Sequence, residues 1–357
     1  MAKQMTKRER VEAALNLRET DRTPIYDILV NDAAIEYLAG KFPPVGEEGL
    51  KLRLRASAKV LDMTRMICGP AAPGETTDAD GFVRHREDRW IDGGVRERPF
   101  SDEDGARAWL RIAIERLRTP VDTKAYAERW RAAHDRFCGY LGDDTVIAYE
   151  YGPGLDWVRY SLGFELFSYL SVDSPELISE YIELNTCREI ERIHAVADRR
   201  VSPCALPYGD IACKDRLLHS PAWLRREFFP RLKRINDALH EHGVKCLFHS
   251  DGYLMDVIPD LIAAGIDGLN PIETVAGMDV GEVKRLYGDR LFIAGGIDIS
   301  QLMANGKPEQ VRKVCRDAVR IASPGYFIGS TTELDNGSRL ENILAMWEVA
   351  LGRNVST

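Results

Sequence analysis

The feature that most constrains the fold is a regular alternation of short apolar strands with amphipathic helices, which begins near residue 120. We expect strands over residues 145–152, 200–210, 244–252, 266–271, 290–298 and 325–333. Several of the intervening helices end at a glycine, such as Gly243, Gly265 or Gly288. Five or more such units in series, without a Gly-rich dinucleotide fingerprint, place the chain in the α/β class and favour a (β/α)8 barrel of the TIM type over a doubly wound sheet.

The chain before residue 120 has a different character. Residues 5–18 predict an amphipathic helix that begins after a Thr6 cap, and residues 21–30 predict a turn and a short strand. Residues 43–56 and 70–118 have the composition of loops.

A hairpin-like segment, GFVRHREDRWIDGG, lies within the second loop-like stretch. We therefore expect one barrel domain over residues 1–357 with an N-terminal helical and hairpin elaboration, in which residues 75–105 form a peripheral insertion or subdomain. An ordinary surface excursion over the same residues is the alternative.

Composition excludes several classes of protein. With 45% hydrophobic and 29% charged residues the chain can bury a large core, and a net charge of −8 disfavours a nucleic-acid or anionic-membrane partner. Seven well-separated cysteines without a CxxC are typical of a reduced cytosolic protein rather than of a disulfide scaffold. The charged N-terminus and the lack of long apolar runs also lead us to expect a cytoplasmic protein that is neither secreted nor membrane-spanning.

Polar side chains gather where the expected strands end, and in (β/α)8 barrels the chemistry lies at those C-terminal ends. The candidate substrate-binding residues are Asp27, Glu150, Tyr151, Tyr208, Asn270 and Ser330. For Tyr151 and Tyr208, packing in the barrel mouth is the alternative. Asp298 has an equally good alternative as the cap of the next helix.

Three of the strand-end residues have the chemistry of a metal site. His249 and Asp251 follow one strand and Glu273 follows the next, so one imidazole and two carboxylates are expected to converge on a divalent ion such as zinc. The alternative is a histidine hydrogen-bonded to neighbouring carboxylates, without a metal. Asp210 ends another strand, and together with His249 and Asp251 it is expected to be catalytic.

Several spaced segments resemble the uroporphyrinogen decarboxylase superfamily, which contains decarboxylases, corrinoid-dependent methyltransferases and, more distantly, cobalamin-independent methionine synthase. These segments are MTKRERVEAALNLRETDRTPI, YGDIACKDRLLHSPAWLRREFFPRLKRI, HSDGYLMDVIPDLIAAGIDGLNPIE, GGID and LENILAM. The resemblance runs nearly end to end and implies a (β/α)8 barrel with the active site in a deep cleft at the strand C-termini.

The decarboxylase branch fits poorly. Its members carry an Arg-rich segment after the RTP turn, whereas this chain has no arginine between Arg22 and Lys41 and has Asp27 and Asp32 there instead. A polyanionic tetrapyrrole would meet negative charge. The Gly-His-Gly near the C-terminus of the decarboxylases is also absent.

The methyltransferase branch fits better. His249 matches the histidine of the H-x-C-G segment of these enzymes, Asp251 stands at the cysteine position, and Glu273 falls where the methionine synthases provide a glutamate ligand. No cysteine stands near Thr332, where the last thiolate ligand would lie. A thiolate-poor centre is harder and more Lewis-acidic, and is suited to polarising an ether or hydroxyl oxygen.

The resemblance therefore implies a methyltransferase-type enzyme: the demethylase component of a corrinoid-dependent methyl-transfer system, acting in O-demethylation on a small methylated or methyl-accepting substrate. Zinc or another divalent metal is the expected cofactor, and a separate corrinoid protein is the expected partner. A homodimer is compatible with the sequence. The alternatives are a metal-free decarboxylase, in which Asp27 or Asp210 steers a proton, and a non-catalytic barrel that binds a small molecule.

Overall fold

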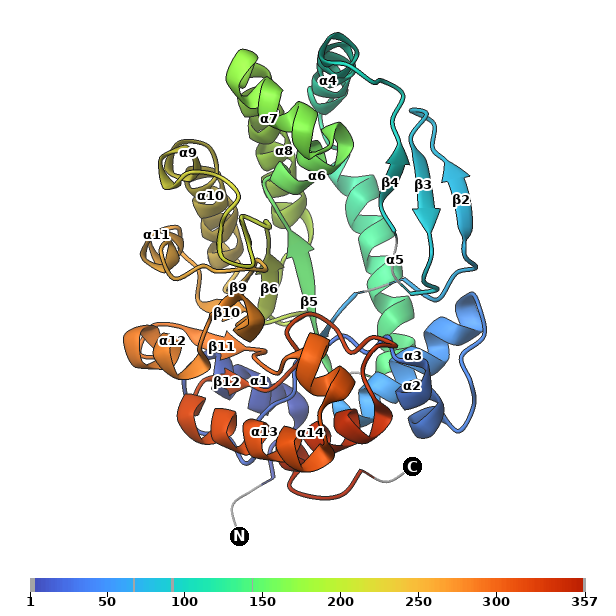
Figure 1. Cartoon of the computed structure of the whole chain (residues 1–357), viewed down its shortest axis with the longest axis vertical. Coiled ribbons are helices and arrows are strands. Elements are labelled where there is room, and N and C mark those ends of the chain that lie inside the picture. Colours follow the sequence, from blue (N-terminus) through green and yellow to red (C-terminus); the bar gives the residue numbers. More distant parts are fainter. Residues whose placement is uncertain (1–3, 67, 91–92, 143, 356–357) are drawn as a thin grey trace.

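The centre of the molecule is a parallel seven-stranded sheet curled into a barrel (Figure 1). The computed structural model describes residues 4–66, 68–90, 93–142 and 144–355. In spatial order the strands are β1 (Met63–Arg65), β5 (Val146–Tyr151), β6 (Cys204–Pro207), β9 (Lys245–His249), β10 (Gly268–Asn270), β11 (Phe292–Ala294) and β12 (Tyr326–Phe327). Each neighbouring pair is parallel, so all seven C-terminal ends lie at one rim of the barrel.

A short extended segment closes the barrel between β12 and β1. Ile25 forms a parallel bridge with Ile328, just after β12, and Tyr26 forms one with Met63 in β1. A Cβ atom on Gly329 would lie 2.0 Å from the Tyr26 carbonyl oxygen, so this close approach requires glycine. The segment takes the eighth strand position, and the predicted (β/α)8 barrel is confirmed.

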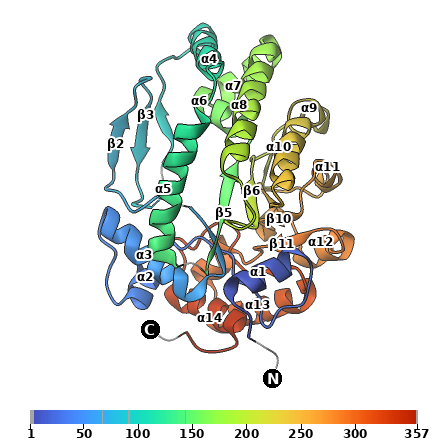
Figure 2. The same ribbon diagram turned by 180° about the vertical axis from the view of Figure 1, so that it is seen from behind.

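Helices surround the strands, as the front and back views show (Figure 1 and Figure 2). They are α2 (Asp32–Ala39), α3 (Glu47–Val60), α5 (Thr123–Leu141), α6 (Leu155–Leu162), α7 (Phe164–Asp173), α8 (Pro175–Val196), α9 (Pro221–Glu227), α10 (Phe229–Glu241), α11 (Ile258–Ala263), α12 (Val280–Tyr287), α13 (Pro308–Ala322) and α14 (Leu340–Leu351), with short turns η1 (Thr274–Ala276) and η2 (Ile299–Met303). In the described part of the chain, no helix has both the length and the apolar character needed to cross a bilayer.

Residue alternation along the strands divides the core into an inner and an outer layer. The inner layer includes Val146 and Ala148 of β5, together with apolar residues from strands around the whole barrel. The helix α1 (Lys7–Leu15) adds Val11, Ala14 and Leu15 to this layer, after the predicted Thr6 cap. The outer layer includes Ile147, Tyr149 and Tyr151, which pack against the helices.

The insertion contains a second, antiparallel sheet of β2 (Gly74–Thr77), β3 (Val83–Arg86) and β4 (Val95–Glu97), followed by α4 (Glu103–Leu117). The predicted hairpin segment supplies β3, which pairs with β2 before it and with β4 just after it, and residues 91–92 of that segment lie outside the described residues. The loop-like reading of 43–56 and 70–118 is wrong where α3 and α4 form. Gly49, which suggested a loop, lies in α3 where the helix packs closely against the backbone of Pro44. A Cβ atom at this position would be 1.9 Å from the Pro44 carbonyl oxygen.

Candidate active site

Three ionisable side chains converge at the C-terminal rim of neighbouring strands β6 and β9. Asp210, His249 and Asp251 each place one ligand atom so that all three atoms lie within 4.8 Å of one another. His249 ends β9, Asp251 follows it by two residues, and Asp210 lies just beyond β6. We call these three residues the rim triad.

His249 has a fixed orientation and a free ring nitrogen. Its Nδ1 lies 2.8 Å from Oδ1 of Asn270, whose own Nδ2 donates to the Ala294 carbonyl at 3.2 Å. The amide oxygen therefore accepts a hydrogen bond from Nδ1–H, and Nε2 keeps its lone pair. Burial, helped by the charge of Arg65, lowers the pKa of His249, so the imidazole stays neutral at neutral pH.

Asp210 is held through its backbone by a buried ion pair on α6. Its N–H lies 3.2 and 3.1 Å from the two carboxylate oxygens of Asp156, and Arg159 donates to its carbonyl oxygen at 2.6 Å. Asp156 and Arg159 also pair with each other and are almost fully buried. The Oδ1 atom of Asp210 accepts the N–H of Asp251 at 3.2 Å, which joins the two carboxylate-bearing loops.

Asp251 presents an unsatisfied oxygen to the triad. Its Oδ1 atom is buried and has no hydrogen-bond partner among the described residues. Burial and, to a lesser extent, repulsion from the nearby carboxylates of Asp210 and Glu273 raise the pKa of Asp251 to about 7. A bound cation would satisfy the oxygen and relieve the repulsion.

The rim triad fits a divalent metal ion. Two ligands at about 2.1 Å from one ion stand at most about 4.2 Å apart, so small side-chain movements would bring the three atoms into coordination distance. One neutral imidazole and two carboxylates form a donor set that zinc and other divalent ions accept.

The structure groups only part of the predicted ligand set. His249 and Asp251 share their group with Asp210, and Glu273 is not a member of it. Glu273 lies beside the turn after Asp251, where its Oε2 accepts the N–H of Gly252 at 2.6 Å.

Asp27 and Ser330 form hydrogen bonds with each other. The Asp27 carboxylate is 1% exposed and accepts the Ser330 N–H and hydroxyl at 2.8 and 2.7 Å and the Ile28 N–H at 2.9 Å. The two residues fasten the closing segment to the chain after β12. Burial still raises the pKa of Asp27, to about 7.

Asp32, the second carboxylate of the charge argument, also has partners of its own. It accepts the Trp90 indole N–H at 2.9 Å and pairs with Arg89 at 3.3 Å. Other carboxylates give the mouth its negative charge. Those of Asp210, Glu273 and Glu333 lie close enough to Asp251 to raise its pKa.

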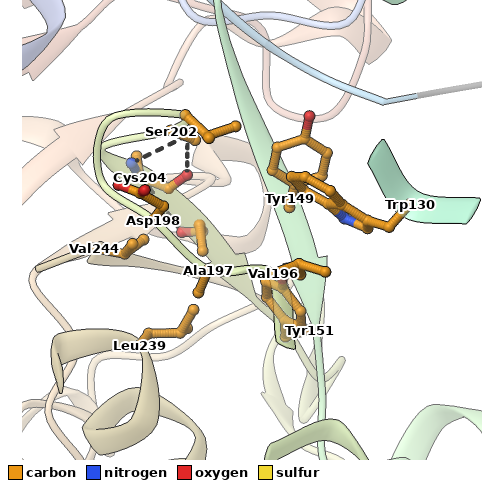
Figure 3. Close-up of a pocket in the computed structure, with 12 residues that line it drawn as sticks. Trp130, Tyr149, Tyr151, Val196, Ala197, Asp198, Ser202, Cys204, Leu239 and Val244 are labelled. Carbon is orange, nitrogen blue, oxygen red and sulfur yellow. Dashed lines mark hydrogen bonds between the residues drawn. The ribbon is translucent and has the colours of Figure 1, made fainter. Parts of the chain in front are cut away.

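The remaining predicted pocket residues lie at the end of β5 or just after β6. Glu150 shares the inner parity and pairs with Arg65 of β1 at 2.6 Å. Tyr208 forms a parallel bridge with His249 and so lies next to the triad. Tyr151 belongs to the outer layer, where it lines, together with Tyr149 and Trp130, a cavity of about 10 Å³, room for one water at most (Figure 3).

Asp298 caps the turn that follows β11. Its carboxylate accepts the N–H groups of Ser300, Gln301 and Leu302, which begin η2. Although burial opposes ionisation, these hydrogen bonds lower the pKa of Asp298 overall. The capping interpretation of this residue is confirmed.

Sequence reasoning missed Arg65, Asp156 and Arg159. Arg65 ends β1, so the strand-end rule would have found it if that three-residue strand had been recognised. The pair of Asp156 and Arg159 gave no comparable signal, because residues three apart on a helix usually form an exposed ion pair.

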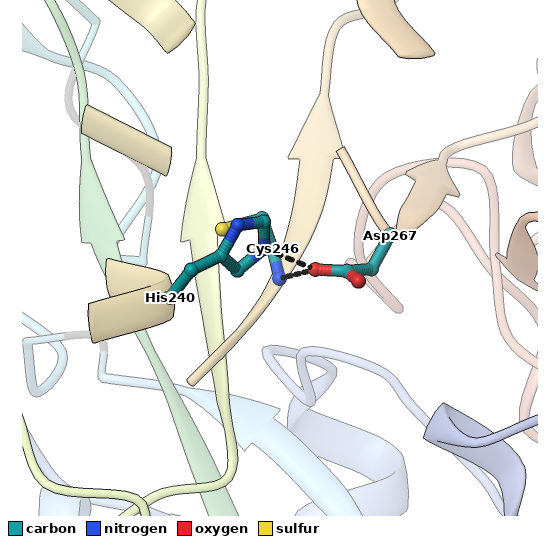
Figure 4. Close-up of side chains that lie close together, drawn as sticks. All are labelled: His240, Cys246 and Asp267. Carbon is teal, nitrogen blue, oxygen red and sulfur yellow. Dashed lines mark hydrogen bonds and ion pairs between the residues drawn. The ribbon is translucent and has the colours of Figure 1, made fainter. Parts of the chain in front are cut away.

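A second group of potential ligands lies at the opposite end of the strands (Figure 4). Both oxygens of Asp267 are already occupied, by His240 and Lys245 at 2.7 Å and by the Cys246 N–H at 2.8 Å. Burial raises the pKa of the Cys246 thiol well above its usual value, so the thiol stays protonated. These contacts make the group a structural clamp.

Comparison with known proteins agrees with the fold and assigns a family. The family model for uroporphyrinogen decarboxylase (URO-D) matches residues 161–351. A solved methyltransferase from Methanosarcina mazei superposes with a TM-score of 0.70 over 98% of this chain and 99% of that chain, at 16% sequence identity.

A B12-independent methionine synthase from Shewanella sp. W3-18-1 matches more loosely, with a TM-score of 0.46 and 13% identity over 93% of this chain and 98% of that chain. No curated protein sequence matches the chain. Because the family model covers more than half of its residues, this chain belongs to the uroporphyrinogen decarboxylase family and is an enzyme.

Proposed function

We propose that this enzyme is a methyltransferase that uses a divalent metal ion at the rim triad to act on a small methylated or methyl-accepting substrate. The observation that carries the proposal is the convergence of Asp210, His249 and Asp251 within 4.8 Å, with one free imidazole nitrogen and one unsatisfied carboxylate oxygen. The resemblance of the HSDG segment to the H-x-C-G segment of zinc methyltransferases supports the reaction class.

The rim triad would hold the ion through Nε2 of His249 and through the carboxylates of Asp210 and Asp251. When bound, such an ion acts as a Lewis acid toward an ether or hydroxyl oxygen. Two carboxylates in place of thiolates make the centre hard, which favours oxygen over sulfur as the reacting atom of the substrate.

Other residues of the chain keep the triad in place. Asn270 fixes the ring plane and the tautomer of His249, and the pair of Asp156 and Arg159 fixes the backbone of Asp210. Partners of this kind govern how well a metal site binds its ion. Arg65, held by Glu150, adds one positive charge to a rim that is otherwise rich in carboxylates.

We propose further that the methyl group is exchanged with a separate corrinoid protein, as the resemblance to corrinoid-dependent methyltransferases implies. O-demethylation is the form of the reaction that the hard donor set favours.

One observation favours the decarboxylase alternative, namely the Arg65 guanidinium at the mouth, which is of the type that binds substrate carboxylates. Its partner Glu150 already occupies it, and several carboxylates surround it. We therefore expect no productive binding of uroporphyrinogen. Coproporphyrinogen formation by the pure enzyme would overturn that expectation.

Metal analysis of matched histidine variants tests the proposal. Wild-type protein should carry about one divalent ion per chain, and His249→Ala should lose both the ion and methyl transfer to a corrinoid acceptor. His240→Ala, which removes a histidine from the clamp at the opposite end of the strands, should keep both. A His249→Ala protein that retains its metal would overturn the proposal.

A further inference from the structure

Helix α7 is apolar on the face that it buries and also on the face that it exposes. Phe167 and Leu170 belong to the core, and α7 contacts α4, α6 and α8 (Figure 1). On the opposite face lie Phe164, Tyr169 and Val172, of which Val172 is 77% exposed. A helix that is apolar all round is a buried helix, so the outer face of α7 lacks a cover in the single chain.

The exposed apolar surface continues onto α6. Trp157 and Tyr160 of α6 and Phe164 and Tyr169 of α7 are each 48–57% exposed. We call these four aromatic residues and Val172 the apolar stripe. The other large apolar side chains that are exposed in the described part of the chain occur singly or in pairs on other elements.

Charge is almost absent from this surface. Residues 157–172, all of which the structure describes, contain two charged residues, Arg159 and Glu165. Arg159 is buried in its pair with Asp156, which leaves Glu165 as the exposed charge of that segment. In a chain with 29% charged residues, a continuous exposed apolar surface marks a face that binds a partner.

The size of the stripe suits a stable dimer. An aromatic side chain has about 150–250 Å² of surface, so four half-exposed rings offer about 400 Å² to a partner. Each chain of a stable complex contributes about 800 Å², divided between an apolar core and a polar rim. The stripe therefore supplies the core of an interface of standard size.

The same face carries a groove that complements the stripe. The groove has a volume of about 620 Å³ and lies between the start of α7 and the segment that leads into α4. Its walls include the side chains of Phe100, Asp102, Glu103, Leu162 and Leu166. When two copies of α7 pack antiparallel, Val172 at the end of one helix reaches the groove at the start of the other. A face with both a projecting residue and a hollow is complementary to itself, as a two-fold interface requires.

Other classes of partner fit this surface less well. An anionic membrane attracts clusters of lysine and arginine, whereas the described segment 157–172 exposes no cation and the chain has a net charge of −8. A carrier protein that leaves after each reaction is expected to use a smaller and more polar interface, because permanent interfaces are the more apolar ones. A second copy of this chain is the partner that the stripe favours.

We propose that this protein is a homodimer and that the apolar stripe forms its two-fold interface, with α7 packed antiparallel against α7 of the second copy. The two-fold axis then passes near the middle of α7, so Tyr169 meets its own copy. The groove of each chain receives Val172 of the other. This inference needs neither the metal nor the methyl-transfer reaction, so it stands or falls independently of the proposed function.

Sedimentation velocity of the full chain tests the proposal. Wild-type protein at about 1 µM should sediment with twice the chain mass of 40.2 kDa, as expected for an apolar interface of standard size. Phe164→Glu and Tyr169→Lys should each weaken the dimer at least about a hundredfold, because every dimer carries the substitution twice.

Both substitutions leave α7 able to form. A glutamate in the first turn suits the helix dipole, and a lysine at position 169 follows Glu165 by four residues, the spacing of a helical ion pair. Ile321→Lys is the matched control on α13, because Ile321 is an exposed apolar residue that follows Asp317 by four residues. The control protein should remain a dimer.

Monomeric wild-type protein at that concentration would overturn the proposal, and co-sedimentation of this monomer with phosphatidylcholine vesicles would identify a membrane-binding face instead. A dimer that persists in both Phe164→Glu and Tyr169→Lys would also overturn it.

Hydrogen exchange of wild-type protein provides a readout without substitutions. The amides of residues 157–172 should exchange at least about tenfold more slowly at concentrations where the dimer forms than in dilute protein. Slowing confined to other segments would contradict the assignment of the interface.

Discussion

Aspartates near the barrel rim differ in behaviour because their hydrogen-bond donors and burial differ. Asp298 accepts three N–H groups of the following turn, and its pKa is lowered. Asp251 has a buried oxygen without a donor, and burial raises its pKa to about 7. Asp27 has three donors but is so fully buried that its pKa is also raised to about 7. Of these three aspartates, Asp251 is the one with a buried carboxylate oxygen that a bound cation would satisfy.

The pH dependence of stability tests the burial of Asp27. Its pKa is raised on folding from the unfolded value near 3.9, so the folded state binds more protons between about pH 4 and pH 7. The stability contributed by this group is full below pH 4 and is lost as pH rises through 7. Relative to Asp27→Asn, wild-type protein should lose about 2 kcal/mol of unfolding free energy between pH 5 and pH 8. Denaturant titrations at both pH values measure this difference, and a pH-independent difference would show that Asp27 ionises freely.

At the scale of elements, α6 acts as a support for the strand-end loop that carries Asp210. Its buried pair of Asp156 and Arg159 contacts the backbone N–H and carbonyl of Asp210 rather than its side chain. A helix contact of this kind sets where the Asp210 carboxylate points without competing for a metal ion.

Asp156→Asn should affect both stability and metal binding. Removing one charge leaves Arg159 buried and unpaired, which costs about 3–5 kcal/mol of unfolding free energy. Metal affinity should fall about tenfold or more, because the support of Asp210 is lost.

Denaturant titration and metal competition with a chelator provide the two measurements for Asp156→Asn. The matched control is Asp198→Asn, which breaks the exposed pair with Arg200 and should leave metal affinity unchanged. Equal metal affinity in wild type and Asp156→Asn would show that α6 does not position Asp210.

At the scale of the whole molecule, much of the barrel could be predicted and part of the site could not. After residue 120, apolar strands alternate with helices that end at glycines. This pattern arises because each strand is buried beneath a helix, and it predicted the barrel architecture correctly. Strand β1 was missed because its three residues are too few to show a period. The place of Asp210 beside His249 and Asp251 was not predicted as a ligand position, because strand order alone does not reveal which of the strand-end carboxylates lie closest together.

Closure of the barrel depends on the contact between the Tyr26 and Gly329 backbones. Gly329→Ala would force a Cβ atom to 2.0 Å from the Tyr26 carbonyl oxygen, so the closing segment must move. We expect a loss of more than about 3 kcal/mol of unfolding free energy, or failure to fold.

Gly139→Ala is the matched control for this closure, since no atom lies within 4 Å of a Cβ atom at that position in α5. That variant should gain about 0.5–1 kcal/mol, because alanine favours the helix. Thermal unfolding of the two variants compares them directly. A Gly329→Ala protein as stable as wild type would contradict the proposed closure.

The most direct test of the account is X-ray absorption spectroscopy of the metal-loaded protein. The rim triad predicts a first shell of nitrogen and oxygen only, at about 2.0–2.2 Å, with the scattering signature of one imidazole that disappears in His249→Ala. Sulfur at about 2.3 Å would contradict the account. It would show that a thiol, such as that of Cys213, binds the metal in place of Asp210 or Asp251. In this structure the Cys213 Sγ lies 3.4 Å from the Arg216 carbonyl oxygen.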